Sequence, residues 1–337
     1  MNRRTWSFIG AIFLFALLGP ACGEPGSVPA ASAAPQPRYF LGNDKTHSRF
    51  SRRIPPVLRV PSGAVIQIDT REVTDNQLTP ASTADALLKL NYNPMHPLTG
   101  PVYVEGAEPG DVLAVKLHRI EIGAWGWAGS ARGFGLLKDE PKEPILKIFT
   151  FKPGDTLARF SDHIAIPVRP FPGVMGVAPA TDSMLVTGPP RANGGNMDNH
   201  YLVAGTTVYF PVFVQGALFS IGDAHVAQGD GEVSTTGIEA PMRIVYEVRV
   251  LKGGRKIAEP QYETDEYYAV GAYGKTLEAA ADKVTRYMID YLVTEHGLSR
   301  AEAYLLCSLA GDLKVTEVVD MPHFWMAMHI PKKIFNK

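Results

Sequence analysis

The sequence contains very little cysteine. Only Cys22 and Cys307 occur among 337 residues, and Cys22 lies at the end of an apolar N-terminal stretch. Removal of that stretch would leave one thiol, which excludes a disulfide framework. Cys307 lies in the apolar run 303–309, so we expect it to be a small buried side chain and not a reactive nucleophile.

The chain also lacks an excess of either charge. Its 33 Lys and Arg residues nearly balance its 34 Asp and Glu residues, which gives a formal net charge of -1. A balanced surface has no general attraction for nucleic acid or for anionic membranes, so we expect no nucleic-acid partner. A small polar or neutral ligand suits this balance better than a polyanion.

Several motifs of common enzymes are missing. The Gly-rich segment 222–231 precedes a strand-like pattern and not a helix, which argues against a phosphate-binding P-loop. There is no G-x-S-x-G nucleophile elbow, and neither cysteine has a catalytic context. These absences disfavour nucleotide hydrolysis and hydrolysis by a serine or cysteine nucleophile.

The N-terminal apolar run is too short to cross a membrane comfortably. It covers residues 6–18, follows two arginines, and is broken by Gly19 and Pro20, which is the pattern of a secretory signal peptide. Residues 23–37 are rich in Pro, Ala and Ser and are typical of a flexible tether. We therefore assign residues 1–34 to a signal peptide and tether.

This assignment predicts export, and two cleavage sites compete. Cleavage after Ala21 would leave Cys22 first, where a lipid would anchor the protein, although Gly19 and not leucine stands three residues before it. Cleavage after Ala33 would release a chain without an anchor, and an uncleaved membrane anchor is the alternative. In every case we expect a folded part outside the cytoplasm, periplasmic or extracellular.

Glycine and proline are abundant and separate many short apolar stretches. The chain has 32 glycines and 27 prolines, which suits short strands joined by tight turns. Residues 112–122 and 242–251 are expected to be strands, the second at a sheet edge or in a hairpin. Residues 170–179, with glycines between prolines, are expected to form a tight loop.

The composition changes after residue 258. Residues 276–295 carry the apolar stripe of a helix, and Ser299 with Glu302 forms a capping box for a second helix. We predict a mainly β fold, with a sandwich-like or barrel-like catalytic body at 35–258. A smaller α+β part at 259–337 is expected to pack on that body.

Segment 123–135 combines glycines with large aromatic side chains. It holds five glycines together with Trp125, Trp127 and Phe134. Such a segment forms either a mobile rim over a pocket or a surface loop that covers a sheet edge. The sequence leaves both interpretations open.

Ionisable residues are concentrated between residues 193 and 239. Asp223 and His225 are alternate residues at a strand end and point to the same side, where they and Asp198 would bind one ion. An imidazole among carboxylates favours zinc or a similar divalent metal. An ion pair within a turn, or a calcium site that uses oxygen ligands without His225, are the alternatives.

The same stretch supplies candidate catalytic groups. Glu232 and Glu239 are candidate general bases, because a metal-activated water needs a carboxylate within hydrogen-bond reach. His96 is a third candidate, since three prolines hold the loop 93–101 in an extended form. The candidate substrate-binding residues are Asn196, Asp75 and Gln228.

Five phrases of the sequence resemble the acetamidase/formamidase family of amide hydrolases. They are NPMHPLTGPVYVEGAEPGDVL (93–113), FPGVMGVAP (171–179), GGNMDNHYL (194–202), GTTVYFPVFVQGALFSIGDAHVAQGDGE (205–232) and AYLLCSLAGDLKV (303–315). The resemblance implies a β-rich body, metal-dependent hydrolysis of short-chain amides, and assembly into homodimers or larger homo-oligomers. By position it implies a metal site at Asp198, Asp223 and His225, with four other residues nearby: Glu232, Glu239, Asn196 and His96.

Two features depart from this family pattern. Familiar members look cytoplasmic, whereas this chain begins with an export signal, and segment 123–143 diverges. The sequence therefore predicts an exported, metal-dependent amidase that converts a formamide-like or acetamide-like substrate into carboxylate and ammonia. The alternatives are an exported, calcium-stabilised β-rich binding protein without turnover, and a hydrolase of a cyclic amide or another acyl compound.

Overall fold

The structure, a computed structural model, describes residues 35–335. Residues 1–34, with the predicted signal peptide, tether and Cys22, lie outside the described residues. Strands predominate in the described part, which confirms the prediction of a mainly β fold. No helix within residues 35–335 is long and apolar enough to cross a membrane.

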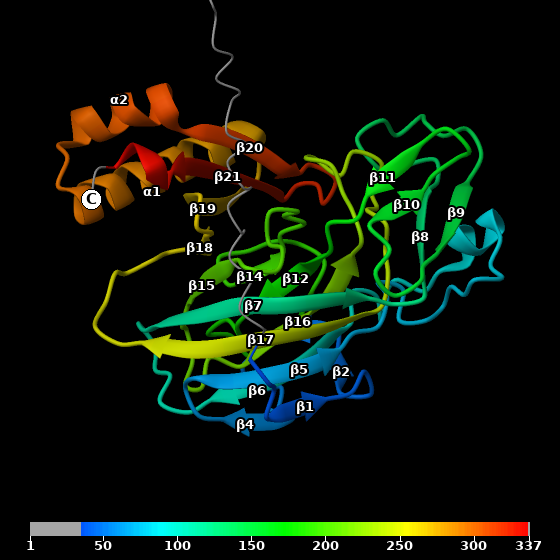
Figure 1. The fold of residues 1–337 in the computed structure, drawn as a ribbon, viewed down its shortest axis with the longest axis horizontal. Helices are drawn as coiled ribbons and strands as arrows, with labels where there is room; N and C mark the ends of the chain where they lie inside the picture. The colour runs from blue at the N-terminus through cyan, green and yellow to red at the C-terminus, as the bar shows by residue number, and fades with distance from the viewer. Residues whose placement is uncertain (1–34, 336–337) are drawn as a thin grey trace, which may run out of the picture. The chain divides into compact units, whose positions relative to one another are not determined.

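A nine-stranded sheet carries strands from both ends of the chain (Figure 1). Its strands are, in spatial order, β1 (Tyr39–Leu41), β5 (Ala64–Asp69), β17 (Met242–Leu251), β7 (Val112–Ile122), β15 (Thr207–Pro211), β18 (Gln261–Glu263), β19 (Tyr267–Gly274), β21 (Phe324–Pro331) and β20 (Asp312–Glu317). The pairing of β15 with β18 carries this sheet from the body into the C-terminal part.

A second sheet lies behind the first in Figure 1. It consists of β14 (Gly194–Asn196), β12 (Phe171–Gly176), β16 (Phe219–His225), β6 (Leu98–Val104) and β2 (Thr46–His47), with β4 (Leu58–Val60) beside β6. Three short pairs complete the strands: β8 (Trp125–Ser130) with β9 (Ile145–Thr150), β10 (Leu157–Arg159) with β11 (Ala165–Pro167), and β3 (Arg49–Phe50) with β13 (Leu185–Val186).

The main hydrophobic core lies between the two sheets. The Phe219 ring of β16 lies 5.5 Å from the Tyr246 ring of β17 and 5.6 Å from the Phe210 ring of β15, measured between ring centres. All three side chains are buried and belong to one cluster with aliphatic residues of both sheets. The body is therefore a β-sandwich, in which each sheet buries one face against the other.

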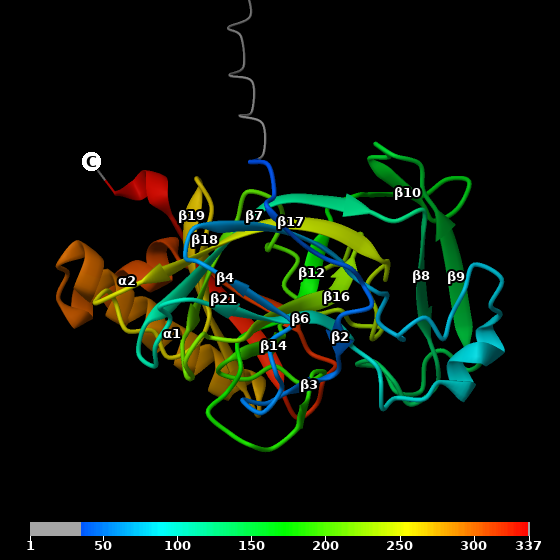
Figure 2. The same cartoon turned by 90° about the horizontal axis from the view of Figure 1, so that it is seen from below.

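Two helices form a separate hydrophobic cluster with the C-terminal strands. They are α1 (Leu277–His296) and α2 (Arg300–Ala310), which lie together beside β18 and β19 in Figure 2. The predicted capping box of α2 is present, and Cys307 is buried in this cluster, as expected. Two short 3-10 helices, η1 (Ala84–Lys89) and η2 (Lys332–Ile334), complete the fold.

Two segments differ from the sequence-based expectation, and for a third the sequence left two interpretations open. β17 has the expected bounds but lies between β5 and β7, not at an edge. Residues 171–176 form the buried strand β12 and not a loop, because their glycines allow close packing of backbones instead of a turn. Part of segment 123–135 is strand β8, and Trp127 is buried within it.

The N-cap of α1 provides a test of helix stability. The hydroxyl of Thr276 accepts a hydrogen bond from the backbone N–H of Ala279 at 3.1 Å. We expect Thr276→Ala to lower the free energy of unfolding by about 1 kcal/mol, since the N-terminal N–H groups of a helix lose an acceptor. Denaturant unfolding followed by circular dichroism measures this change.

The matched control is Thr285→Ala within the same helix. The Thr285 hydroxyl donates to the Ala281 carbonyl oxygen at 2.7 Å, a bond that is not needed to end the helix. Because alanine has the higher helix propensity, we expect no loss of stability there. Equal losses in the two variants would contradict the role of the cap.

Candidate active site

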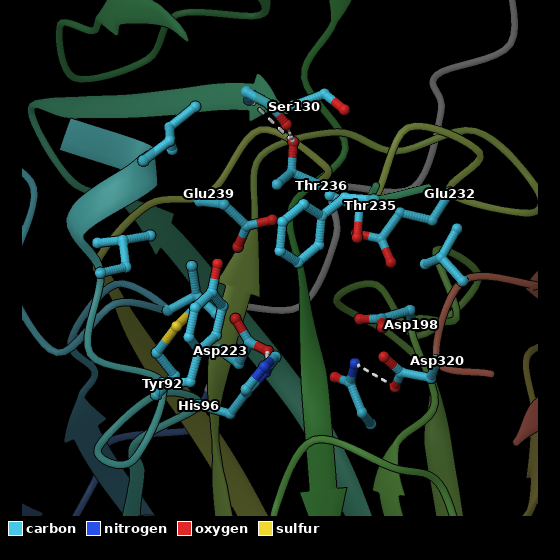
Figure 3. A pocket seen from close by; sticks show the side chains of 18 of the residues that line it. Tyr92, His96, Ser130, Asp198, Asp223, Glu232, Thr235, Thr236, Glu239 and Asp320 are labelled. Carbon is cyan, nitrogen blue, oxygen red and sulfur yellow. Dashed lines mark hydrogen bonds and ion pairs between the residues drawn. The ribbon is translucent and has the colours of Figure 1, made fainter. Parts of the chain in front are cut away.

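A cavity of about 380 Å³ opens where the smaller sheet meets the turn that follows β20 (Figure 3). Its walls are largely apolar, whereas its base is lined by ionisable side chains. The ionisable lining residues are Asp198, Asp223, Glu232, Glu239, Asp320, His96 and His225. Five carboxyl groups and two imidazoles thus line one cavity.

His225 lies at the centre of this base, and its neighbours fix its tautomer. Its Nδ1 lies 2.7 Å from Oε1 of Gln228, whose Nε2 donates to the Asp198 carbonyl oxygen at 2.7 Å. Because the Gln228 amide nitrogen is the donor, its Oε1 accepts and the proton of the neutral ring is on Nδ1. The unprotonated Nε2 is then free to bind a metal, with Gln228 orienting the ring.

Three carboxylates approach the Nε2 atom of His225. One oxygen each of Glu239, Asp223 and Asp198 lies 3.1, 3.6 and 3.8 Å from this nitrogen. All three oxygens are buried and lack a hydrogen-bond partner among the described residues. Unpaired buried carboxylate oxygens are unfavourable, so the arrangement favours a bound cation.

The distances from Nε2 to the three oxygens suit ligands of a divalent metal. Ligand atoms around a tetrahedral zinc ion are separated by about 3.3 Å, since each bond is about 2 Å long. Ligand atoms of Asp198, Asp223 and His225 lie within 4.8 Å of one another, as do those of His225, Glu232 and Glu239. The imidazole at the centre favours zinc or a similar metal over calcium, which prefers oxygen ligands.

The ionisation of the cluster reflects its excess of negative charge. Burial and repulsion from neighbouring carboxylates raise the pKa of Asp198 and Glu239, and that of Glu232 to about 8. Asp223 differs: burial opposes its ionisation, but His96, whose Nδ1 lies 2.7 Å from Oδ2, holds its pKa below the usual value. Burial also opposes the charged form of His96, yet Asp223 raises its pKa to about 9.

Asp320 is a site residue that the sequence analysis missed. It follows β20, and its Oδ2 accepts a hydrogen bond from Nδ2 of Asn196 at 3.0 Å. Burial raises the pKa of Asp320 to about 6. Asp320 is distant in sequence from the 193–239 stretch and has no local motif, so only the three-dimensional fold reveals its position.

Four site residues adopt a left-handed backbone conformation that only glycine adopts easily. The φ angles are 37° at Asp198, 46° at Asp223, 48° at Glu232 and 54° at His96. Each such residue costs about 1–3 kcal/mol, and such residues are concentrated at functional sites. Figure 3 shows the four side chains directed toward the same space.

The structure distributes the other predicted residues differently. Asn196 lines the cavity, whereas Gln228 lies behind His225 and supports it. Asp75 is outside the cavity lining among the described residues, and its Oδ1 accepts a hydrogen bond from Arg71 at 2.6 Å. Asp75 is therefore not brought together with the other candidates.

Comparison with known proteins identifies the family. The sequence profile of the Acetamidase/Formamidase family matches residues 38–187 and 181–337. The chain belongs to the acetamidase/formamidase family. This membership confirms the resemblance and makes the chain a hydrolase of carbon–nitrogen bonds in linear amides.

This acetamidase/formamidase member is similar to named enzymes and to solved structures. An acetamidase of Mycolicibacterium smegmatis is 30% identical over 271 residues, which cover 62% of this chain and 66% of that protein. A formamidase of Methylophilus methylotrophus is 26% identical, covering 86% of this chain and 89% of that protein. The crystal structure of a predicted acetamidase/formamidase from Thermoanaerobacter tengcongensis matches with a TM-score of 0.83 and 34% identity, covering 88% and 96% of the two chains.

Gly173 of β12 brings the backbone directly against the carboxylate cluster. A Cβ atom there would lie 2.5 Å from Oδ1 of Asp198 and 2.8 Å from the backbone oxygen of Asp223. We expect Gly173→Ala to lower the free energy of unfolding by about 1–3 kcal/mol, because the Asp223 backbone has little room to move. Denaturant unfolding measures the loss.

The control for this substitution is Gly254→Ala, because a Cβ atom at Gly254 has no other atom within 4 Å. We expect its unfolding free energy to stay within about 0.5 kcal/mol of the original value. If Gly173→Ala were as stable as the control, the cluster would have more space than the structure allows.

Proposed function

We propose that this family member is an exported, metal-dependent amidase that hydrolyses R–CO–NH2 to carboxylate and ammonia. One observation carries the metal part of the proposal. The contacting oxygens of Asp198, Asp223 and Glu239 surround Nε2 of His225, are buried, and have no hydrogen-bond partner among the described residues. A divalent metal is the species that satisfies all of them together.

Four residues are proposed to hold the metal: Asp198, Asp223, His225 and Glu239. Glu239 was a candidate base from sequence, but its oxygen is the nearest of the three to Nε2, which suits a ligand better. A bound metal of this kind polarises a carbonyl group and lowers the pKa of water to about 7.

Glu232 is the proposed proton carrier. It lines the cavity, and its Oε1 lies 3.9 Å from Nδ1 of His225, whereas the other three carboxylates approach Nε2. Because Nδ1 is hydrogen-bonded to Gln228, the carboxylate of Glu232 is not needed as its acceptor and is available for proton transfer. It would accept a proton from the attacking water and deliver it to the departing nitrogen.

Asn196 is proposed to orient the amide group. Its Nδ2 donates to Asp320, which leaves Oδ1 as an acceptor, and this buried oxygen has no partner among the described residues. An acceptor in the cavity wall suits the N–H groups of an amide, since an unpaired acceptor rejects substrates without a donor. His96 is proposed to act through Asp223, which it holds in place by hydrogen bonding.

Export and self-association complete the proposal. Export is supported by the signal-like pattern of residues 6–18 with the preceding arginines. Self-association is supported by the family resemblance and by α2, on which Leu305 and Leu309 are 60% and 74% exposed.

Metal removal tests the proposal directly. We expect the metal-stripped mature protein to lose ammonia release from amides and to regain it with zinc. His225→Ala is expected to abolish metal retention and to lower ammonia release by about 100-fold or more, because the central ligand is lost. Elemental analysis and an ammonia assay over linear amides and a γ-lactam give the two readouts.

A matched histidine serves as the control. His118 of β7 pairs with Glu247 on the large sheet, so His118→Ala is expected to keep both metal and activity. Activity that survived complete stripping would remove the metal from the mechanism. Calcium retained by His225→Ala without turnover would support the binding-protein alternative instead.

The Gln228 contact generates a prediction about metal affinity. Gln228→Ala removes the acceptor that fixes Nδ1 of His225, and such supporting contacts contribute about 10–100-fold to metal affinity. We expect a weaker zinc affinity of this size in a competition titration with a chelator. Gln67→Ala on β5, away from the cavity, is expected to leave the affinity unchanged.

A further inference from the structure

One wall of the cavity is built for an apolar group. Val73, Leu87, Leu90, Met95 and Trp127 line it, and all five belong to one hydrophobic cluster formed by η1, β8 and the adjoining loops. The reaction itself requires no such wall, because water, ammonia and the amide group are polar.

Trp127 forms a rigid part of this wall. Its Nε1 donates to Oε2 of Glu72 at 2.9 Å, and Glu72 also accepts hydrogen bonds from Thr74 and Asn76. The backbone of Trp127 is hydrogen-bonded in both directions to that of Glu239, at 2.9 and 2.7 Å. The indole is therefore held beside the proposed metal position before any ligand binds, which lowers the entropic cost of binding.

The mouth of the cavity exposes two aromatic rings. Tyr92 and Phe134 both line it, and their rings stack with centres 6.1 Å apart at an angle of 16°. They are 56% and 41% exposed. Exposed aromatic side chains around a concave apolar wall are typical of a binding site for an apolar ligand.

The size of the cavity exceeds what a formyl or acetyl group fills. Cavities that bury a drug-sized ligand start at roughly 300 Å³, and this one measures about 380 Å³. Acetamide, with a single methyl group beside its amide, would leave most of the apolar wall in contact with water.

We propose that the substrate is a primary amide with a phenyl-sized or hexyl-sized acyl group, which packs against Leu87, Leu90 and Trp127 and reaches Phe134. This inference rests on the proposed function. Water adds its oxygen to the carbonyl carbon, the C–N bond breaks, and the nitrogen leaves as ammonia after gaining the proton that water loses. The products are the apolar carboxylic acid and ammonia, with no further reactant.

The experiment compares kcat/KM for ammonia release from formamide, acetamide, hexanamide and benzamide, using the metal-loaded mature protein. Each methylene that moves from water to the wall contributes about a fourfold gain. We therefore expect hexanamide and benzamide to exceed acetamide by on the order of 100-fold.

Leu90→Trp tests the wall itself. A larger side chain at this half-buried position fills the apolar part of the cavity, so we expect the ratio of kcat/KM for hexanamide to that for acetamide to fall at least about tenfold. The control is Leu88→Trp in the 3-10 helix η1, which ends directly before Leu90. Leu88 is 65% exposed and outside the cavity lining, so this variant should leave every rate unchanged. Unfolding midpoints of both variants report whether they are folded.

A second pair of variants tests the inference if Leu90→Trp does not fold. Phe134→Ala removes an apolar contact at the mouth and should lower kcat/KM for benzamide, whereas Phe160→Ala, also 41% exposed but outside the lining, should not.

Preference for acetamide over both large amides would overturn this inference and leave the proposed function standing. Release of ammonia from no amide would overturn both. A change of oligomeric state in Leu90→Trp with unchanged specificity would assign the wall to a second copy and overturn the inference.

Discussion

Buried negative charge without matching positive charge is the constraint on which the cavity depends. Five carboxyl groups and two imidazoles line its base. Such a group of side chains is tolerated only when its members share protons or a cation, since a lone carboxylate is far more stable in water. The surrounding contacts hold these side chains in place: Gln228 orients His225, and Asn196 holds Asp320.

The C-terminal part contributes directly to this base. Thr316 of β20 accepts hydrogen bonds from Gly231 and from Gln228, and its hydroxyl donates to the Met197 carbonyl oxygen. One strand therefore fixes the segments that carry Asp198 and Glu232, and the turn after it supplies Asp320. The nine-stranded sheet, which continues from the body through β18 to β20, sets this position. The α+β part is thus a structural component of the site.

Strand bounds could be predicted from the sequence better than strand positions. Residues 112–122 and 242–251 are strands with the expected ends, but the second lies in the middle of its sheet. An alternation of apolar and polar residues indicates that one face of the strand is exposed to solvent. This is true of a central strand in an open-faced antiparallel sheet as well as of an edge strand. The alternation therefore could not fix the neighbours of β17.

Only the part of the site that is local in sequence could be predicted. Asp223 and His225 are two residues apart on one strand, and the other candidates of the 193–239 stretch are close to them in sequence. Asp320 and the role of Gln228 depend on contacts between distant segments. Glycine is ambiguous as well, because it occurs both in turns and where backbones pack closely. The glycines of residues 171–176 suggest a turn, but at Gly173 of β12 the missing side chain leaves space for the Asp198 carboxylate.

The left-handed residues of the site have a consequence for protein engineering. Replacing Asp198, Asp223, Glu232 or His96 by glycine would relieve an unfavourable backbone conformation while removing a functional group. A screen that selects only for heat resistance would therefore favour inactive variants at these positions. A selection for a more thermostable enzyme therefore needs to measure turnover together with heat resistance. At these four positions glycine favours the backbone conformation, whereas the reaction needs the side chain.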